Sequence, residues 1–398
     1  MATRDAEAPR RQALGELAWL FLRLGTTAFG GPAAHIAMME DEVVRRRRWL
    51  TREQFLDLLG ATNLIPGPNS TELAIHIGHA RAGWHGLFVA GACFILPAAV
   101  IVTACAWLYV QVGRLPEFSG ILYGVKPVVI AVVLQALWRL ARTALRGAWP
   151  AFFALCAAVA NCAGAGEIAV LGGTALVAGA VHLVRRSGTR SPPGANCHPL
   201  ALAPWVGSSA FAGIGGVAPV ASAGTAVGLL PLFAFFVKVG SVLFGSGYVL
   251  LAFLRGGLVH DRGWLTEAQL LDAVAIGQVT PGPVFTTATF IGYLLAGGAG
   301  AVAATAGIFL PAFVFVAISG PLVPRLRRSP LAGAVLDGVN AASLALMAVV
   351  TAQLAQAAVV DWTSLSMALA AALGLFSLRV NSSWLVLGGA VAGLVVKA

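Results

Sequence analysis

Long apolar stretches with almost no charged residues run through the whole chain and restrict the folds open to it. Only 11% of the 398 residues are charged and 58% are hydrophobic, and the mean hydropathy is +0.84. Soluble domains carry about a quarter charged residues, whereas about 20 apolar residues make a helix that crosses a ~30 Å hydrocarbon layer. We therefore predict an all-α polytopic protein of the plasma (inner) membrane, surrounded by the lipid bilayer, and exclude a soluble globule.

The basic character of the chain fits this class better than it fits nucleic-acid binding. There are 26 Lys and Arg residues against 16 Asp and Glu, a net charge of +10. The arginines gather in short clusters between apolar stretches, as in cytoplasmic loops, at Arg45 to Arg48, Arg139/Arg142/Arg146, Arg185/Arg186/Arg190 and Arg325/Arg327/Arg328. No nucleic-acid partner is expected. Because no nucleotide-binding glycine loop, haem motif or paired-cysteine motif occurs, no cofactor or metal is expected either.

The chain contains an internal duplication with an offset of 215 residues. Trp49-Leu50-Thr51 matches Trp264-Leu265-Thr266, and Pro66-Gly67-Pro68 matches Pro281-Gly282-Pro283. The repeat predicts three parts: an N-terminal repeat at 14–184, a linker with one bridging transmembrane helix at 185–228, and a C-terminal repeat at 229–397. The bridging helix is expected near 201–225. Placing every strong arginine cluster on the cytoplasmic side favours two repeats of inverted topology.

Two apolar segments in each repeat are interrupted. The first is broken at Phe29-Gly30-Gly31-Pro32 and its copy at Phe244-Gly245-Ser246-Gly247; the next is cut by the Pro-Gly-Pro. Proline fits the first turn of a helix, so we expect new half-helices to begin around 68–71 and 283–286, with free N–H groups that suit an anion. The alternative is a kinked structural helix, but two breaks at equivalent places favour a site between broken or re-entrant helices.

Charged and amide side chains near these breaks complete the predicted site. Arg23 and Lys238 are repeat equivalents, Lys126 has no charged equivalent, and Asn63 matches Gln278. Anchoring of the cations at the membrane interface and bonding of the amides to the backbone are the competing interpretations. The predicted substrate-binding set is Arg23, Phe29, Gly30, Gly31, Asn63, Pro66, Gly67, Pro68, Asn69, Ser70, Thr71, Lys126, Lys238, Phe244, Gly245, Ser246, Gln278, Pro281, Gly282, Pro283, Thr286 and Thr287.

Glu72, His76 and His79 lie on one helical face, at a spacing that metal ligands also use. The second repeat has no histidine there and no fourth ligand is evident, so metal binding is not favoured. Glu72 is instead a candidate for proton coupling, and solvation at the interface is the alternative for the histidines.

These motifs, Phe29-Gly30-Gly31-Pro32 with His35, Trp49-Leu50-Thr51, Pro66-Gly67-Pro68 and their second copies, resemble the chromate ion transporter family in its long, two-domain form. The second copy departs from the pattern at Ser246-Gly247. The resemblance implies export of chromate, resistance to it, and sulfate as a competitor. The expected partners are chromate, sulfate and a second copy of the chain in a homodimer.

The residues alone indicate only a carrier for an oxyanion-sized anion and leave two alternatives. One is an ion-coupled sulfate or oxyanion importer that uses Glu72. The other is a membrane enzyme or reductase built around Glu72, His76 and His79, although no catalytic motif supports an enzyme.

Overall fold

The computed structural model describes residues 2–29, 31–112, 116–145, 147–188, 227–244, 249–327, 329–378 and 380–397, and every regular element in these ranges is helical. Five helical segments within them are long and apolar enough to cross a membrane: Asn69–Val112, Gly120–Arg142, Glu167–Arg185, Val284–Ser319 and Pro330–Ala358. The prediction of an all-α polytopic membrane protein is confirmed. The bridging helix expected at 201–225 lies outside the described residues.

The elements of the two halves follow one another in the same order. The first half holds α1 (Ala2–Thr27), α2 (Gly31–Glu40), the π-helical turn η1 (Asp41–Arg46), α3 (Arg52–Thr62), α4 (Asn69–Val112), α5 (Pro116–Ala144), α6 (Ala148–Cys162) and α7 (Glu167–Gly188). The second half holds α8 (Leu229–Val242), α9 (Leu250–Leu254), the π-helical turn η2 (Arg255–His260), α10 (Glu267–Val279), the short 3-10 turn η3 (Val284–Thr286), α11 (Thr287–Arg327), α12 (Pro330–Ala358), α13 (Trp362–Phe376) and α14 (Ser382–Lys397).

Local hydrogen bonds repeat between the halves. Thr51 begins α3 with a capping box, in which its hydroxyl accepts from Gln54 N–H at 3.2 Å and Gln54 Oε1 accepts from Thr51 N–H at 2.9 Å. Thr266 and Gln269 form the same box at the start of α10. The repeated Trp-Leu-Thr motif therefore marks the start of a helix in both halves, because its threonine supplies the cap for the first free N–H groups.

Three of the four predicted interruptions are found where the sequence places them, and the fourth, at Phe244-Gly245-Ser246-Gly247, lies largely outside the described residues. α1 ends at Thr27 and α2 begins at Gly31, while α3 ends at Thr62 and α4 begins at Asn69. In the second half α10 ends at Val279 and helical structure resumes at Val284. Each Pro-Gly-Pro thus forms a non-helical loop with a new helix directly after it.

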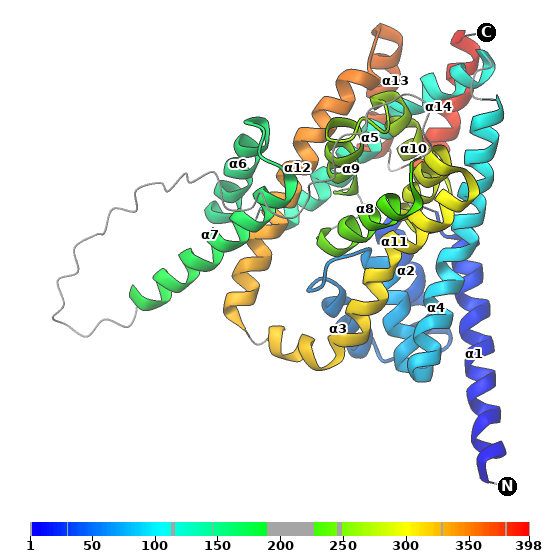
Figure 1. The fold of residues 1–398 in the computed structure, drawn as a ribbon, viewed down its shortest axis with the longest axis vertical. Coiled ribbons are helices and arrows are strands. Elements are labelled where there is room, and N and C mark those ends of the chain that lie inside the picture. Colours follow the sequence, from blue (N-terminus) through cyan, green and yellow to red (C-terminus); the bar gives the residue numbers. More distant parts are fainter. Residues whose placement is uncertain are drawn as a thin grey trace.

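α4 folds back on itself shortly after this start. Ala82 and Gly83 leave the helical conformation, and Gly78 lies so close to Gly86 that a Cβ on either would strike the backbone of the other. The two arms therefore lie side by side, as Figure 1 shows. The first arm, 69–81, is about 20 Å long and too short to cross a bilayer. α11 has the same fold-back at Ala296 and Gly297.

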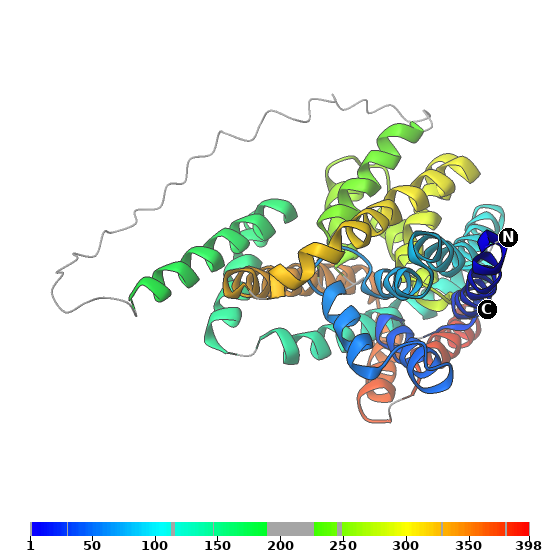
Figure 2. The same ribbon diagram turned by 90° about the horizontal axis from the view of Figure 1, so that it is seen from below.

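The two halves interlock. α4 packs against α11 at the centre, α1 lies on α4, and α8 lies on α11 (Figures 1 and 2). The helix that follows the folded-back one in each half packs against the last two helices of the other half. α5 contacts α13 and α14, and α12 contacts α6 and α7. Residues far apart in the sequence consequently meet at the centre of the molecule.

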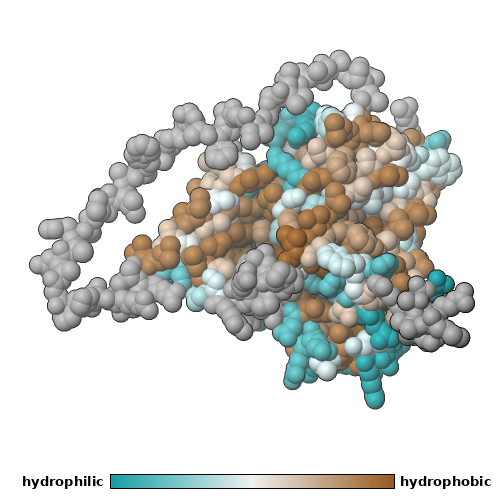
Figure 3. Space-filling model, turned by 60° about the horizontal axis from the view of Figure 1, so that its bottom comes forward, coloured by the Kyte–Doolittle hydropathy of each residue, from teal (hydrophilic) through white to brown (hydrophobic). Residues whose placement is uncertain are grey.

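The surface suits a lipid environment. Figure 3 shows hydrophobic surface over much of the body, with most hydrophilic side chains at the lower end and a smaller hydrophilic patch at the upper edge. Exposed apolar side chains come from both halves and include Trp19, Val100, Leu176, Leu369 and Trp384. A soluble monomer would not present so much apolar surface to water, so this face is in contact with the bilayer.

Candidate functional site

Each Pro-Gly-Pro loop is held by a backbone hydrogen bond from the opposite half. Gly67 N–H donates to the Leu243 carbonyl at the end of α8, at 2.7 Å. Gly282 N–H donates to the Ala28 carbonyl at the end of α1, at 3.0 Å. Because 67 and 282, and likewise 28 and 243, are repeat equivalents, the two loops make the same contact in exchanged positions.

Only glycine fits the middle of these loops. Gly67 has φ +140° and Gly282 has φ +90°, both in the region that disfavours residues with a Cβ. A Cβ on Gly67 would also overlap the Glu72 carboxylate, and one on Gly282 would lie 2.5 Å from the Ala98 Cβ. Gly282 therefore allows its loop to approach the opposite half closely, whereas Gly67 leaves room for the Glu72 side chain of its own half.

A cavity of about 290 Å³ lies between the two loops. Elements from both halves form its walls, including the starts of the helices that follow the Pro-Gly-Pro motifs. Its lining comprises Pro32, Ala33, Ile36, Asn63, Pro68, Asn69, Ser70, Val132, Gln135, Ala136, Arg139, Leu140, Pro283, Val284, Phe285 and Ser382. This size is sufficient for a small anion together with several water molecules.

The polar groups in this cavity suit an anion. Asn69 Nδ2 donates to Asn63 Oδ1 at 2.8 Å, which joins the end of α3 to the start of α4. Among the described residues, no backbone carbonyl accepts from the N–H groups of Asn69 and Ser70, the first two residues of α4. Together with the positive end of the helix dipole, these donors favour a negative ligand. Arg139 on α5 adds a full positive charge to the lining.

The cavity collects some of the predicted residues and adds others. Asn63, Pro68, Asn69, Ser70 and Pro283 lie in it, as expected for neighbours of the breaks. The sequence interpretation did not include the other lining residues, of which Gln135, Arg139, Phe285 and Ser382 are the polar or aromatic ones. Arg139 could have been noticed in the sequence, because it belongs to the cluster Arg139/Arg142/Arg146, but that cluster was assigned to a cytoplasmic loop. Nothing in the sequence distinguishes the other three.

Other predicted residues lie near the loops without lining the cavity, and several are bonded locally. Thr286 and Thr287 donate their hydroxyls to the carbonyls of Pro283 and Val284, at 2.8 Å each. Gly67 and Gly282 hold the loops as described above. The remaining positions outside the lining are Phe29, Gly31, Pro66, Thr71, Phe244, Gln278 and Pro281. Gly30, Gly245 and Ser246 lie outside the described residues.

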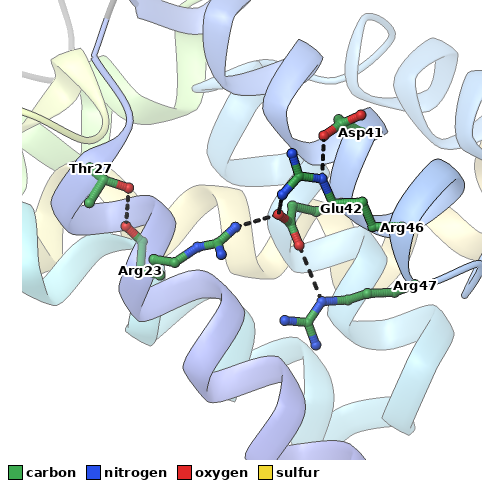
Figure 4. A network of polar contacts seen from close by, with 6 residues as sticks. All are labelled: Arg23, Thr27, Asp41, Glu42, Arg46 and Arg47. Atoms are coloured by element: carbon green, nitrogen blue, oxygen red, sulfur yellow. Dashed lines mark hydrogen bonds and ion pairs between the residues drawn. The ribbon is translucent and has the colours of Figure 1, made fainter.

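Arg23 lies in a separate network of charges (Figure 4). Its guanidinium pairs with Glu42 of η1, which also accepts from Arg46 at 3.2 Å and from Arg47 at 3.3 Å. Arg46 in turn pairs with Asp41 at 2.7 Å. Burial alone would raise the pKa of Glu42, but the hydrogen bonds from Arg23 and Arg47 outweigh it and hold the pKa below its usual value. Substrate binding by Arg23 stays a prediction, since this network gives it a structural partner.

Lys126 pairs with a carboxylate from the other half. Its Nζ lies 2.9 Å from Asp272 Oδ1, and the Tyr109 hydroxyl donates to Asp272 Oδ2 at 2.8 Å. Both members of the ion pair are largely shielded from solvent, with 20% and 6% of their side chains exposed. The pair ties α5 to α10, and substrate binding by Lys126 stays a prediction.

Lys238, the repeat equivalent of Arg23, is exposed and acts electrostatically on Glu167 at the start of α7. The position equivalent to Glu42 is Gly257, so the second half has no matching carboxylate on η2. Glu167 instead packs against the neighbouring Gly256. Substrate binding by Lys238 also stays a prediction.

Glu72 is fully buried in the first turn of α4, and neither carboxylate oxygen has a hydrogen-bond partner within the described residues. His76, one turn further on, is also buried, whereas His79 packs edge-on against Trp84 at 5.5 Å between ring centroids. In the described parts of the chain no three His, Cys, Asp or Glu side chains are grouped to hold a metal ion.

Fold and cavity together define a multi-pass membrane protein whose two homologous halves enclose a small polar cavity. The family model for chromate transporters matches the chain twice, at residues 15–181 and 230–394. The chain belongs to the chromate transporter family, which makes it a transporter of the plasma (inner) membrane rather than an enzyme.

Curated relatives agree with this assignment. The chain is 33% identical over 395 residues to the chromate transport protein of Cupriavidus metallidurans, covering 96% of this chain and 93% of the relative. It is 34% identical to the chromate transport protein of Pseudomonas aeruginosa, covering 84% and 80% of the two chains. A probable chromate transport protein of Synechococcus elongatus is 31% identical, with 84% and 83% covered. No solved structure is significantly similar to the chain.

Proposed function

We propose that this protein is a secondary transporter that exports chromate from the cytoplasm through the cavity between the two Pro-Gly-Pro loops, and that it thereby confers chromate resistance. The observation that carries the proposal is the meeting of both loops, the free amides at the start of α4 and Arg139 around one cavity. The names of the relatives support chromate as the substrate.

The cavity supplies what a tetrahedral oxyanion requires. Its donors are neutral amides and hydroxyls, which bind oxygen atoms without a fixed geometry, and one guanidinium that can pair with two oxygens at once. Sulfate has the same shape and charge as chromate. A modest difference in ligand size rarely changes the binding free energy by more than about 1–3 kcal/mol, so we expect sulfate to compete with chromate for the cavity.

The direction follows from electrostatics. A dianion that leaves a negatively charged cytoplasm gains about 4.6 kcal/mol per 100 mV of membrane potential. Export is therefore favourable without a coupling ion, whereas uptake of the same anion would need one.

The fold-backs of α4 and α11 support a mechanism in which short half-helices end at the cavity. In this proposal the repeats at 14–184 and 229–397 have inverted topology, the broken segments are re-entrant, and rocking of one repeat against the other exposes the cavity alternately to each side. Assembly into homodimers stays a prediction.

The test is chromate flux in sealed proteoliposomes under an imposed potential, with and without excess sulfate. Saturable flux that grows with the potential and falls with sulfate is expected. Flux of sulfate without chromate would contradict chromate as the substrate, and flux of neither would contradict the whole proposal.

A further inference from the structure

A buried carboxylate lies directly behind the anion cavity. Glu72 is inaccessible to solvent, and neither of its carboxylate oxygens has a hydrogen-bond partner in the described ranges. A Cβ on Gly67 would overlap its Oε1, so the carboxylate packs against the loop whose next residues, Pro68 and Asn69, line the cavity. An unpaired charge is strongly disfavoured at such a place, and the uncharged acid is the form that these surroundings favour.

The second half shows that the loop does not need this carboxylate. Thr287 occupies the equivalent position, and its hydroxyl donates to the Val284 carbonyl and closes its own turn. Both loops nevertheless make the same cross-repeat hydrogen bond through Gly67 and Gly282. The first half therefore carries an acidic group that the shared architecture does not require.

The surroundings of Glu72 supply no permanent counterion. The opposite half contributes the Leu243 carbonyl, which is occupied by Gly67, and the apolar Ala312 of α11. No charged neighbour acts on the carboxylate in the described structure. The titratable groups on α4 itself are His76, His79, Arg81 and His85. The elements packed against α4 add Glu16 and Arg23 of α1, His35 and Glu40 of α2, Arg52, Glu53 and Asp57 of α3, and Glu267 and Asp272 of α10, while Lys126 and Arg139 lie on α5.

We propose that Glu72 is a proton-binding site coupled to the anion cavity, so that the protein binds the oxyanion most tightly when Glu72 holds a proton. A negative Glu72 behind the first turn of α4 would repel a dianion in front of it, whereas a neutral Glu72 would not. Anion binding and protonation therefore favour each other, and by linkage the effect is reciprocal. The inference rests on the proposed function.

Proton uptake on binding tests this directly. Purified full-length protein is titrated with chromate at pH 8 and above, where chromate is a dianion, by calorimetry in two buffers of different ionisation enthalpy. We expect proton uptake to approach one per chromate, and the affinity to fall up to tenfold per pH unit, over the pH range in which Glu72 of the free protein ionises. Glu72→Gln should bind chromate without proton uptake and with an affinity independent of pH.

Two further variants keep the result interpretable. Glu53→Gln, at an exposed position on α3, is the matched control and should behave as the wild type. If Glu72→Gln does not fold, Glu72→Thr introduces the residue that the second repeat uses. Chromate binding by the wild type without proton uptake, or with dependence on sodium instead of pH, would overturn the inference while leaving the proposed function intact. Absence of chromate binding in wild type and control would contradict the proposed function itself.

Discussion

The amide of Gly67 donates to the carbonyl of Leu243, and its repeat equivalents make the same bond in the opposite direction, from Gly282 to Ala28. Each half of the protein thus closes the helix break of the other. This exchange places both Pro-Gly-Pro loops at one cavity and makes the halves mutually dependent.

Replacing Gly67 by Ala should destabilise the protein by about 2 kcal/mol or more. The Cβ would require a backbone conformation that costs about 1–3 kcal/mol and would overlap the Glu72 carboxylate. Thermal unfolding in detergent measures the effect. Gly15→Ala is the matched control, because no atom lies within 4 Å of a Cβ there. Equal stability of the two variants would show that the loop tolerates a side chain.

Arg139→Gln should weaken chromate binding about tenfold or more, because the guanidinium is the full positive charge in the described cavity lining. Arg142→Gln, one turn further along α5 and outside the lining, should retain wild-type affinity. Equilibrium binding to purified protein distinguishes them. If both variants bind chromate as the wild type does, the cavity is not where the anion is held.

Asp272→Asn should destabilise the protein by about 3 kcal/mol, because it leaves Lys126 without its partner in a largely shielded position. Lys126→Met together with Asp272→Leu should recover most of this loss. Unfolding of both single variants and the double variant gives the coupling energy. Chromate flux by the double variant also decides the role of Lys126: retained flux indicates a structural role, whereas lost flux in a stable protein indicates contact with substrate.

Glu42→Gln should reduce stability by about 1–3 kcal/mol at pH 7 through loss of its charged hydrogen bonds. The folded-state pKa of Glu42 lies below its usual value, so its contribution is present above the unfolded pKa and disappears as the pH falls through the folded pKa. Melting curves at pH 7 and at successively lower pH compare the variant with the wild type. A stability difference that does not shrink in acid would contradict the network in Figure 4.

The sequence predicted those parts of the fold that depend on local chemistry. Proline and glycine restrict the backbone directly, so the helix ends at Thr27 and Thr62 and the restart at Asn69 could be placed from the motifs alone. Duplicated caps such as Thr51 and Thr266 are equally local. What could not be predicted depends on contacts between the halves: the exchange of the loops, and the pairing of Lys126 with Asp272.

The same distinction explains the candidate site. Asn63, Asn69 and Ser70 adjoin a break and were expected near the ligand, whereas Arg139 is brought there by the packing of α5. Its membership of a basic cluster suggested a loop. The enrichment of arginine in cytoplasmic loops does not distinguish an arginine that orients the protein in the membrane from one that binds an anion. Arg23 was expected at the substrate because it precedes a break; it pairs with Glu42 of η1, and substrate binding by Arg23 stays a prediction.

The position of the bound anion decides most directly whether the cavity between the loops is the transport site. Crystals grown with chromate permit this measurement, since chromium scatters anomalously and its position can be found without interpreting weak density. We predict the strongest chromium peak between Pro68 and Pro283, in contact with Arg139 and the first turn of α4. A strongest peak beside Arg23 and Glu42, with nothing between the loops, would contradict the proposed site.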